Sequence, residues 1–400
     1  MKKTFFQRLQ QVKIKDLLHI ALFMVAIIPA IIYKLTHTPY WLICDYENEA
    51  RDNGYFFFKY LREQHPEQKV WYAINKKSPD YDRVKKIGNV VNYGGLYHWI
   101  LYLAAQVNIS SQKGGKPNAA VCYALEVSGI LKNKRVFLQH GIIKDDLPYV
   151  HYDKAKFWLF VTTTKREQDY VSGKFGYPNG AVKQLGLCRY DYLCNEAKGN
   201  KILVMPTWRQ WIAHKDYKSK TVESADDFRD TLYYSRWSEL LGSSDIKRLL
   251  DKYNIEIKFY PHRNMQAYAS EFAGEEIGRI KIVTWPQYDL HQLIKECDIL
   301  ITDYSSVAMD FAYLEKPVIY YQFDYDQFRK GHLQEGYFNY MDDGFGPICC
   351  NKEQVIEALE EYINNDFEIE GKYIHRIAGF FDLRDKGNCN RTYEAINNLL

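Results

Sequence analysis

The amino-acid sequence predicts an α/β protein with two successive units, each built on a parallel sheet. From Tyr40 onward, short apolar runs alternate with amphipathic stretches, which is the order of strands and helices in such units. A chain of 400 residues is long enough for two domains that each bury a core. The polar stretch 194–201 separates two such runs of alternation and predicts the domain boundary.

The predicted strands are short runs rich in apolar, β-branched and aromatic residues. In chain order they are 41–44, 70–73, 107–110, 136–139, 157–162, 202–205, 256–260, 281–284, 299–302 and 318–321. The helices predicted between them, each with one apolar face, are 54–64, 244–252, 290–297 and 305–314. Residues 212–243 are polar and aromatic without clear periodicity, and we interpret them as an insertion. The predicted parts are a segment 1–39, a first domain 40–195 and a second domain 196–400.

The segment 1–39 combines basic and apolar residues. An uncharged apolar run, 17–33, follows the basic residues Lys2, Lys3, Arg8, Lys13 and Lys15. This run is at the lower length limit for a spanning helix, and lysine or arginine beside it favours an anionic leaflet. The pattern predicts peripheral or shallow attachment to the cytoplasmic face of the cell membrane through residues 1–35. A spanning helix and a helix buried in the protein are the alternatives.

Bulk composition argues against several other classes. Lys+Arg 53 against Asp+Glu 50 gives a net charge of +3, which is too balanced for nucleic-acid binding through bulk electrostatics. The eight cysteines contain no CxxC pair and are expected to be reduced, mostly buried thiols of a cytosolic protein. No zinc motif or metal–diphosphate clamp stands out, so the sequence predicts no metal and no cofactor.

The stretch 298–321 reads as strand, polar turn, helix and strand. Ser305 or Ser306 can cap the helix, and free backbone N–H groups with two hydroxyls at a helix start favour an oxyanion. A phosphate site is the functional interpretation, and a plain helix cap is the alternative. Asp303 would repel a pyrophosphate, so we expect it to order the turn by accepting backbone N–H groups, or to fix His262 or Arg209.

Three further side chains follow predicted strands. His140 lies at the end of 136–139 before Gly141, where an imidazole can act as a general base. His262 follows 256–260, and Arg209 follows 202–205 with a guanidinium that can fork onto phosphate oxygens. Taken alone, His140 is more often a structural histidine and Arg209 more often an ordinary surface arginine. For His262 the alternative is a surface His-Arg pair with Arg263.

Four stretches occur in a characteristic order: FLQHG at 137–141, LVMPTWR at 203–209, YPH at 260–262 and TDYSS at 302–306. Together they resemble the HG, APTWR, second-histidine and TDYSS or SDYSS elements of the CDP-glycerol glycerophosphotransferase family, the teichoic-acid primases and polymerases. Weaker similarity extends over roughly residues 40–398. One departure is that Pro261 precedes the histidine and Arg263 takes the place of the proline that usually follows it.

The resemblance implies a GT-B-like fold, with two Rossmann-like domains whose parallel sheets face an interdomain cleft. It also implies catalytic roles for His140 as acceptor base and for His262 at the leaving group. The donor phosphates would be bound by Arg209, Thr207, Ser305, Ser306 and Arg329. By similarity alone, Glu315 becomes a candidate for the ribose.

The implied reaction moves glycerol phosphate from CDP-glycerol to a hydroxyl of a lipid-linked or polymeric cell-surface glycan of the teichoic acid or capsule type, and releases CMP. The implied partners are that donor, the lipid-linked acceptor and an anionic membrane surface, with no nucleic acid. A donor such as CDP-ribitol or a nucleotide sugar is the alternative within enzymes. A noncatalytic, membrane-associated nucleotide-binding scaffold is the alternative of another class. The acceptor, the number of units added and the oligomeric state stay open.

Overall fold

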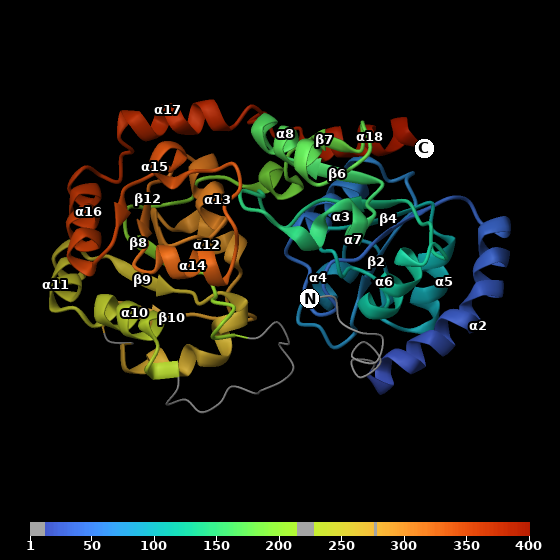
Figure 1. Cartoon of the computed structure of the whole chain (residues 1–400), viewed down its shortest axis with the longest axis horizontal. Helices are drawn as coiled ribbons and strands as arrows, with labels where there is room; N and C mark the ends of the chain where they lie inside the picture. The colour runs from blue at the N-terminus through green and yellow to red at the C-terminus, as the bar shows by residue number, and fades with distance from the viewer. Residues whose placement is uncertain (1–12, 214–227, 276–277) are drawn as a thin grey trace. The chain divides into compact units, whose positions relative to one another are not determined.

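The computed structural model describes residues 13–213, 228–275 and 278–400 (Figure 1). The chain divides into two compact units. Unit 1 comprises Met1–His140, Pro148–Tyr192 and Asp385–Leu400, and unit 2 comprises Gly141–Leu147 and Leu193–Arg384. The main boundary lies close to the predicted one. The predicted division differs at 141–147, which belongs to unit 2, and at 385–400, which belongs to unit 1.

The seven-stranded sheet of unit 1 is parallel throughout, in the order β3-β2-β1-β4-β5-β6-β7. The strands are β1 Trp41–Ile43, β2 Val70–Ile74, β3 Asn89–Asn92, β4 Val107–Ser110, β5 Arg135–Phe137, β6 Leu159–Thr162 and β7 Val182–Gln184. The strand order reverses between β1 and β4. Loops at the carboxyl ends of the strands around such a point are where α/β proteins place their ligands.

Helices flank this sheet and bury two apolar clusters. They are α2 Ile14–Thr36, α3 Asn53–Gln64, α4 Tyr81–Lys85, α5 Leu96–Ala104, α6 Ala119–Val127, α7 Tyr152–Ala155, α8 Lys165–Lys174 and α18 Asn388–Leu399. One cluster joins Trp41 and Phe57 to Ile396 of α18, and the other joins Trp99 of α5 to Phe23 of α2. The C-terminal segment belongs to unit 1 because α18 buries its apolar face in the first cluster.

The six-stranded sheet of unit 2 is also parallel, in the order β10-β9-β8-β11-β12-β13. Its strands are β8 Lys201–Met205, β9 Glu256–Phe259, β10 Ile280–Ile282, β11 Ile299–Thr302, β12 Val318–Tyr321 and β13 Ile348–Cys349. The order reverses between β8 and β11, which places the loops after these two strands at the centre of the unit's carboxyl edge.

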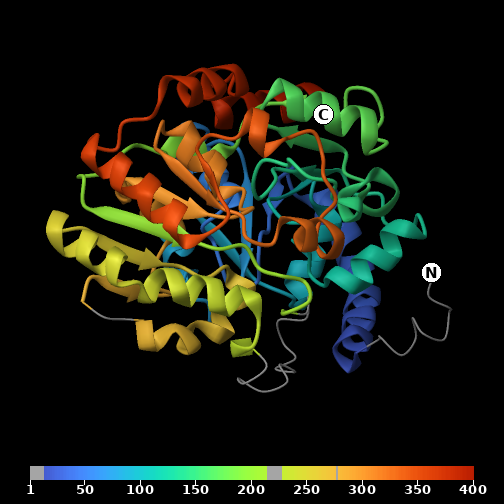
Figure 2. The ribbon, with the colours of Figure 1, turned by 60° about the vertical axis from the view of Figure 1, so that its left-hand side comes forward.

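The described helices of unit 2 are α10 Leu232–Gly242, α11 Ser244–Tyr253, α12 Leu290–Glu296, α13 Val307–Tyr313, α14 Tyr325–Gly331, α15 Tyr340–Asp343, α16 Lys352–Asn364 and α17 Gly371–Phe380. Figure 2 shows the yellow helices α10 and α11 and the orange-red helix α16 together over one face of this sheet. Their buried residues, among them Trp237, Leu250 and Leu359, form one cluster with the strands.

Helix α2 packs one face on unit 1 and exposes the other. Phe23, Ala26 and Ala30 are buried beside α5, and Figure 1 shows the two helices next to each other. The opposite face exposes ten large apolar side chains: Ile14, Leu17, Leu18, Ile20, Met24, Val25, Ile28, Ile31, Ile32 and Leu35. Within the described part of the chain, α2 is the one helix long and apolar enough to cross a membrane.

The predicted elements are present, with ends displaced by up to two residues, and the strands that were not predicted lie at sheet edges. Strands β3, β7 and β13 are edge strands, and β3 and β7 carry polar residues that blur the apolar signal. Helix α10 lies inside the stretch 212–243, where the sequence shows no clear periodicity that would predict a helix. The basic residues Lys2, Lys3 and Arg8, and much of 212–243, fall outside the described residues.

Candidate functional site

His140 lies in a tightly held loop after β5. The preceding residue, Gln139, adopts a left-handed backbone with φ 63° and is fully buried. Its side-chain amide donates to Glu167 Oε1 at 3.0 Å, and its carbonyl accepts from Asn53 Nδ2 at 2.8 Å. Arg189 Nη1 donates to the His140 carbonyl at 2.6 Å. A strained residue held by this many partners fixes the direction of the imidazole that follows.

The His140 ring forms a pair with Asp52 at the start of α3. His140 Nδ1 lies 2.5 Å from Asp52 Oδ2, and the histidine side chain is 64% exposed while Asp52 is 12% exposed. Gln112 Nε2 donates to the same carboxylate oxygen at 2.9 Å, and the backbone N–H of Asn53 donates to the other at 2.8 Å. A carboxylate at Nδ1 favours the tautomer with its proton there, which makes Nε2 the basic nitrogen.

A second carboxylate, Asp45, is buried close enough to Asp52 to interact with it electrostatically. Asp45 Oδ1 accepts from the Ser111 backbone N–H at 2.7 Å, and its other oxygen accepts from the Tyr72 hydroxyl at 3.2 Å. Burial, and then the neighbouring Asp52, raise the pKa of Asp45 to about 7. Gly54 is required here because a Cβ would lie 2.4 Å from the carboxylate oxygens. The loops after β1, β4 and β5 thus gather one imidazole and two carboxylates at the carboxyl edge of unit 1.

In unit 2, the turn after β11 is ordered by Asp303. Its Oδ1 accepts the backbone N–H of Thr207 at 2.8 Å and that of Tyr304 at 2.6 Å, which is the turn-ordering geometry expected from the sequence. Ser305 Oγ accepts from the Val307 N–H at 3.2 Å, whereas Ser306 makes no side-chain cap bond. Helix α13 begins at Val307, two residues later than predicted, because the serines form the turn that precedes it.

Arg209 is enclosed rather than presented to a ligand. Its side chain is fully buried, with Nε 2.8 Å from Asp324 Oδ2, Nη2 2.8 Å from Asp303 Oδ2, and Nη1 donating to the Thr207 carbonyl at 2.7 Å. Burial alone would lower the pKa of the guanidinium, but Asp303 and Asp324 outweigh it and hold that pKa above its usual value. This geometry favours a structural role for Arg209, joining the loops after β8, β11 and β12, over the predicted role of phosphate ligand.

His262 follows β9 and lies beside the tryptophan of the PTWR motif. The His262 and Trp208 ring centroids are 6.3 Å apart at an interplanar angle of 26°. The Trp208 ring also meets the edge of His332, at 4.5 Å. Thr207 is 9% exposed, and its hydroxyl has no hydrogen-bond partner among the described residues. The loops after β8 and β9 and the end of α14 therefore bring together two imidazoles, an indole and a hydroxyl.

The structure pairs the two remaining predicted ligands with side chains of unit 2. Arg329 Nη1 lies 2.6 Å from Asp145 Oδ1 in the segment 141–147, which explains why that segment belongs to unit 2. Glu315 Oε1 accepts from Arg384 Nη1 at 2.5 Å. Arg329 retains buried Nε and Nη2 groups without hydrogen-bond partners among the described residues. Its role in binding the phosphates of the nucleotide donor stays a prediction. The ribose role of Glu315 also stays a prediction.

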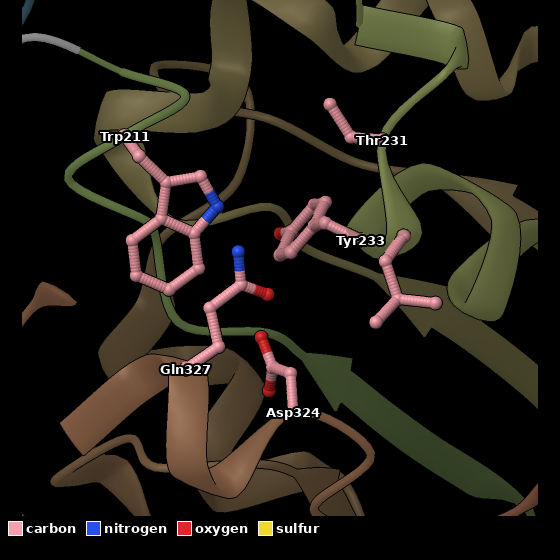
Figure 3. Close-up of a pocket in the computed structure, with 6 residues that line it drawn as sticks. Trp211, Thr231, Tyr233, Asp324 and Gln327 are labelled. Carbon is pink, nitrogen blue, oxygen red and sulfur yellow. The ribbon is translucent and has the colours of Figure 1, made fainter. Parts of the chain in front are cut away.

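A pocket of about 180 Å³ opens beside the Arg209 network. Figure 3 shows Trp211, Tyr233 and Gln327 around it, with the Asp324 carboxylate at its base. No sequence motif points to this pocket, because its lining comes from residues on both sides of the stretch 214–227 and from α14.

Several site residues were assigned no role in the sequence interpretation. Asp52 and Arg189 reach His140 from 88 and 49 positions away, and Asp324 reaches Arg209 from 115 positions away. No spacing rule connects residues at such separations. One signal was present in the sequence: Asp52 directly precedes a predicted amphipathic helix, which is the position of an acidic N-cap.

The family model described as CDP-glycerol:poly(glycerophosphate) glycerophosphotransferase matches residues 29–398 of this sequence. The chain belongs to this family. The glycerophosphotransferase match includes His140, the Asp52 that holds it, and every described loop of the unit 2 site. The resemblance inferred from the four motifs is therefore confirmed.

Two relatives of this chain are named for the synthesis of teichoic acids. The minor teichoic acid biosynthesis protein GgaB of Bacillus subtilis (strain 168) is 32% identical over 367 residues, which cover 90% of this chain and 40% of GgaB. The teichoic acid poly(ribitol-phosphate) polymerase of Bacillus spizizenii is 32% identical over 246 residues, covering 60% of this chain and 37% of the polymerase. The chain thus spans about 40% of the length of these relatives.

A solved structure of the wall teichoic acid polymerase TagF has the same fold. The TM-score is 0.64 at 14% sequence identity, and the match covers 97% of this chain and 100% of the TagF chain. The predicted GT-B-like pair of parallel α/β units with an apolar N-terminal helix is confirmed. That the two carboxyl edges face one cleft stays a prediction.

Proposed function

We propose that this chain transfers glycerol phosphate from CDP-glycerol to a hydroxyl of a lipid-linked or polymeric cell-surface glycan and releases CMP. The observation that carries the proposal is the Asp52–His140 pair at the carboxyl edge of unit 1, in a chain that belongs to the glycerophosphotransferase family. An exposed imidazole oriented by a carboxylate is the arrangement that a hydroxyl-activating base requires.

In the proposed reaction, His140 Nε2 takes the proton of the acceptor hydroxyl as its oxygen attacks the phosphorus that carries glycerol. The new O–P bond forms while the bond from this phosphorus to the bridging oxygen breaks. CMP departs with that oxygen and its electron pair. Asp52 stabilises the imidazolium that results, and no covalent enzyme intermediate is needed.

The donor phosphates are assigned to the carboxyl edge of unit 2. Thr207, Ser305 and Ser306 supply hydroxyls there, and His262 supplies an imidazole that can donate to the departing phosphate. The buried Thr207 hydroxyl without a partner supports this assignment, because such a group gains most from a bound oxyanion. We assign Arg209 to holding these loops in place, since its guanidinium already serves two carboxylates.

CDP-ribitol is the second candidate donor. A poly(ribitol-phosphate) polymerase is among the 32% identical relatives, and ribitol phosphate presents the same reacting phosphorus as glycerol phosphate. The chemistry at His140 would be unchanged, and contacts to the polyol alone would decide between the donors.

Membrane attachment is proposed to occur through α2 lying in the interface plane. Phe23, Ala26 and Ala30 dock along α5, so a membrane-crossing α2 would carry the polar loops of unit 1 into hydrocarbon, where their backbone groups lack partners. The exposed apolar face would instead enter the leaflet surface, as in interfacial helices. This supports the predicted shallow attachment over the spanning alternative.

The activity is tested by incubating the full chain with CDP-glycerol or CDP-ribitol and a glycan-lipid acceptor, and measuring CMP release. His140→Ala should reduce the rate by about 10²- to 10⁴-fold, the usual contribution of a general base. His375→Ala, at an exposed histidine of α17, is the matched control and should retain full rate. CMP release at full rate from His140→Ala would remove the histidine from the mechanism.

A further inference from the structure

A pocket of about 430 Å³ lies at the end of α2. Its lining includes the basic side chains Lys34, His37, Lys132 and Lys134, and no aspartate or glutamate is among its lining residues in the described part of the chain. His37 is held in place by stacking on Tyr33, with ring centroids 3.8 Å apart. We call this cavity the α2 basic pocket. Its charge suits an anion, and its volume exceeds what a single water or small ion needs.

The α2 basic pocket lies at the amino edge of the unit 1 sheet. Its three wall segments directly precede strands: Thr38–Tyr40 precede β1, Leu103–Gln106 precede β4, and Lys132–Lys134 precede β5. His140 follows β5 and therefore lies at the opposite, carboxyl edge. The hydroxyl and phosphorus that react at His140 therefore do not occupy this pocket.

The apolar face of α2 continues up to the pocket. Ile28, Ile31, Ile32 and Leu35 on the last turns of the helix are all more than half exposed. The pocket residues Lys34 and His37 lie on the same stretch of chain. The helix starts near the carboxyl edge, where Asn118 Nδ2 donates to Asp16 Oδ1 at 2.9 Å, and ends at the amino edge. An exposed hydrocarbon surface thus leads directly into a basic cavity.

We propose that the α2 basic pocket binds the phosphate headgroup of an anionic phospholipid whose acyl chains lie along the exposed face of α2. The inference rests on the proposed in-plane attachment of α2 and adds a specific headgroup site to it. Charge complementarity and the continuous apolar surface select a phospholipid over a free anion, because a free anion gains nothing from Ile31, Ile32 and Leu35. The bound lipid would fix the orientation of unit 1 on the leaflet.

The test compares binding of the full chain to vesicles of phosphatidylcholine alone and to vesicles that also contain phosphatidylglycerol. The pocket variant combines Lys34→Gln, Lys132→Gln and Lys134→Gln. The matched control combines Lys165→Gln, Lys174→Gln and Lys198→Gln at exposed lysines elsewhere, so that the net charge falls equally from +3. We expect the pocket variant to lose on the order of 100-fold affinity for phosphatidylglycerol vesicles, from three lysines near the leaflet, and the control to lose far less.

Equal losses in both variants would overturn the headgroup site and leave only bulk electrostatics. A third variant, Ile28→Gln with Ile32→Gln, separates the two proposals, since it should weaken binding to both kinds of vesicle. If it binds normally, the attachment through α2 is wrong. If it loses binding while the pocket variant keeps it, the pocket proposal alone is wrong.

A last measurement distinguishes the phospholipid from the lipid-linked acceptor. CMP release is measured with the acceptor in neutral detergent micelles, where no anionic phospholipid is present. The pocket variant should turn over at the wild-type rate, which also shows that it is folded. A selective loss of turnover there would assign the pocket to the acceptor and overturn the proposal.

Discussion

At His140, the orientation of one side chain depends on groups that the sequence separates widely. Asp52 holds Nδ1 of the imidazole, Arg189 holds its carbonyl, and Gln139 carries the backbone strain before it. In its proposed role as base, an imidazole so constrained keeps one tautomer and one direction, which lowers the cost of organising the transition state.

Asp52→Asn tests this positioning role. Asparagine keeps the helix cap of α3 but lacks the carboxylate, so we expect kcat for CMP release to fall about 10²- to 10⁴-fold with little change in the donor KM. Asp169→Asn, at an exposed aspartate of α8, should leave both constants unchanged. A larger effect on KM than on kcat would contradict the assignment of Asp52 to the base.

Replacing Arg209 distinguishes a phosphate-binding role from a structural ion pair. Arg209→Ala leaves Asp303 and Asp324 buried without their cation, which should cost about 3–5 kcal/mol of unfolding free energy. Arg248→Ala, at an exposed arginine of α11, should change that free energy by no more than about 0.5 kcal/mol. Urea denaturation without donor measures both. Normal stability of Arg209→Ala with weakened donor binding would restore the role as phosphate ligand.

At the scale of the element, α2 is an apolar helix whose two faces have different neighbours. The small side chains of Ala26 and Ala30 let one face of α2 pack closely on α5, whereas the other face carries long branched side chains. The sequence shows one apolar run in which both faces look alike, so the assignment of the packed face came from the tertiary structure.

Ala26→Leu should therefore destabilise unit 1 and Val25→Leu should not. Ala26 is fully buried, so the added carbons overpack the α2–α5 contact at a cost of about 1–3 kcal/mol. Val25 is 59% exposed, and its replacement should stay within about 0.5 kcal/mol. Thermal unfolding of the two variants gives the comparison, and equal melting temperatures would contradict the docked position of α2.

At the scale of the whole molecule, the chain leaves each unit and returns to it. The segment 141–147 joins unit 2 directly after His140, and the last helix, α18, returns to unit 1. The chain therefore passes from unit 1 to unit 2 directly after His140, and from unit 2 back to unit 1 before α18.

Ile396→Ala tests whether α18 packs on unit 1. Ile396 is fully buried in the cluster that includes Trp41 and Phe57, so the cavity left behind should cost unit 1 about 2–5 kcal/mol. Leu400→Ala, four residues later and 41% exposed, is the control. Native-state hydrogen exchange would locate the loss in strands of unit 1, and a loss confined to unit 2 would show that the helix belongs there.

The sequence by itself determined the alternation of the main strands and helices, a domain boundary predicted at 194–201, the family and the loops that carry His140, His262, Ser305 and Ser306. Local periodicity and short motifs specify these features because each depends on residues close together in the chain. Only the tertiary structure decided that Asp52 orients His140, that Arg209 is enclosed by Asp303 and Asp324, and which face of α2 is packed. Those relations depend on loops brought together at the carboxyl edge of each sheet, and on burial, neither of which leaves a fixed spacing in the sequence.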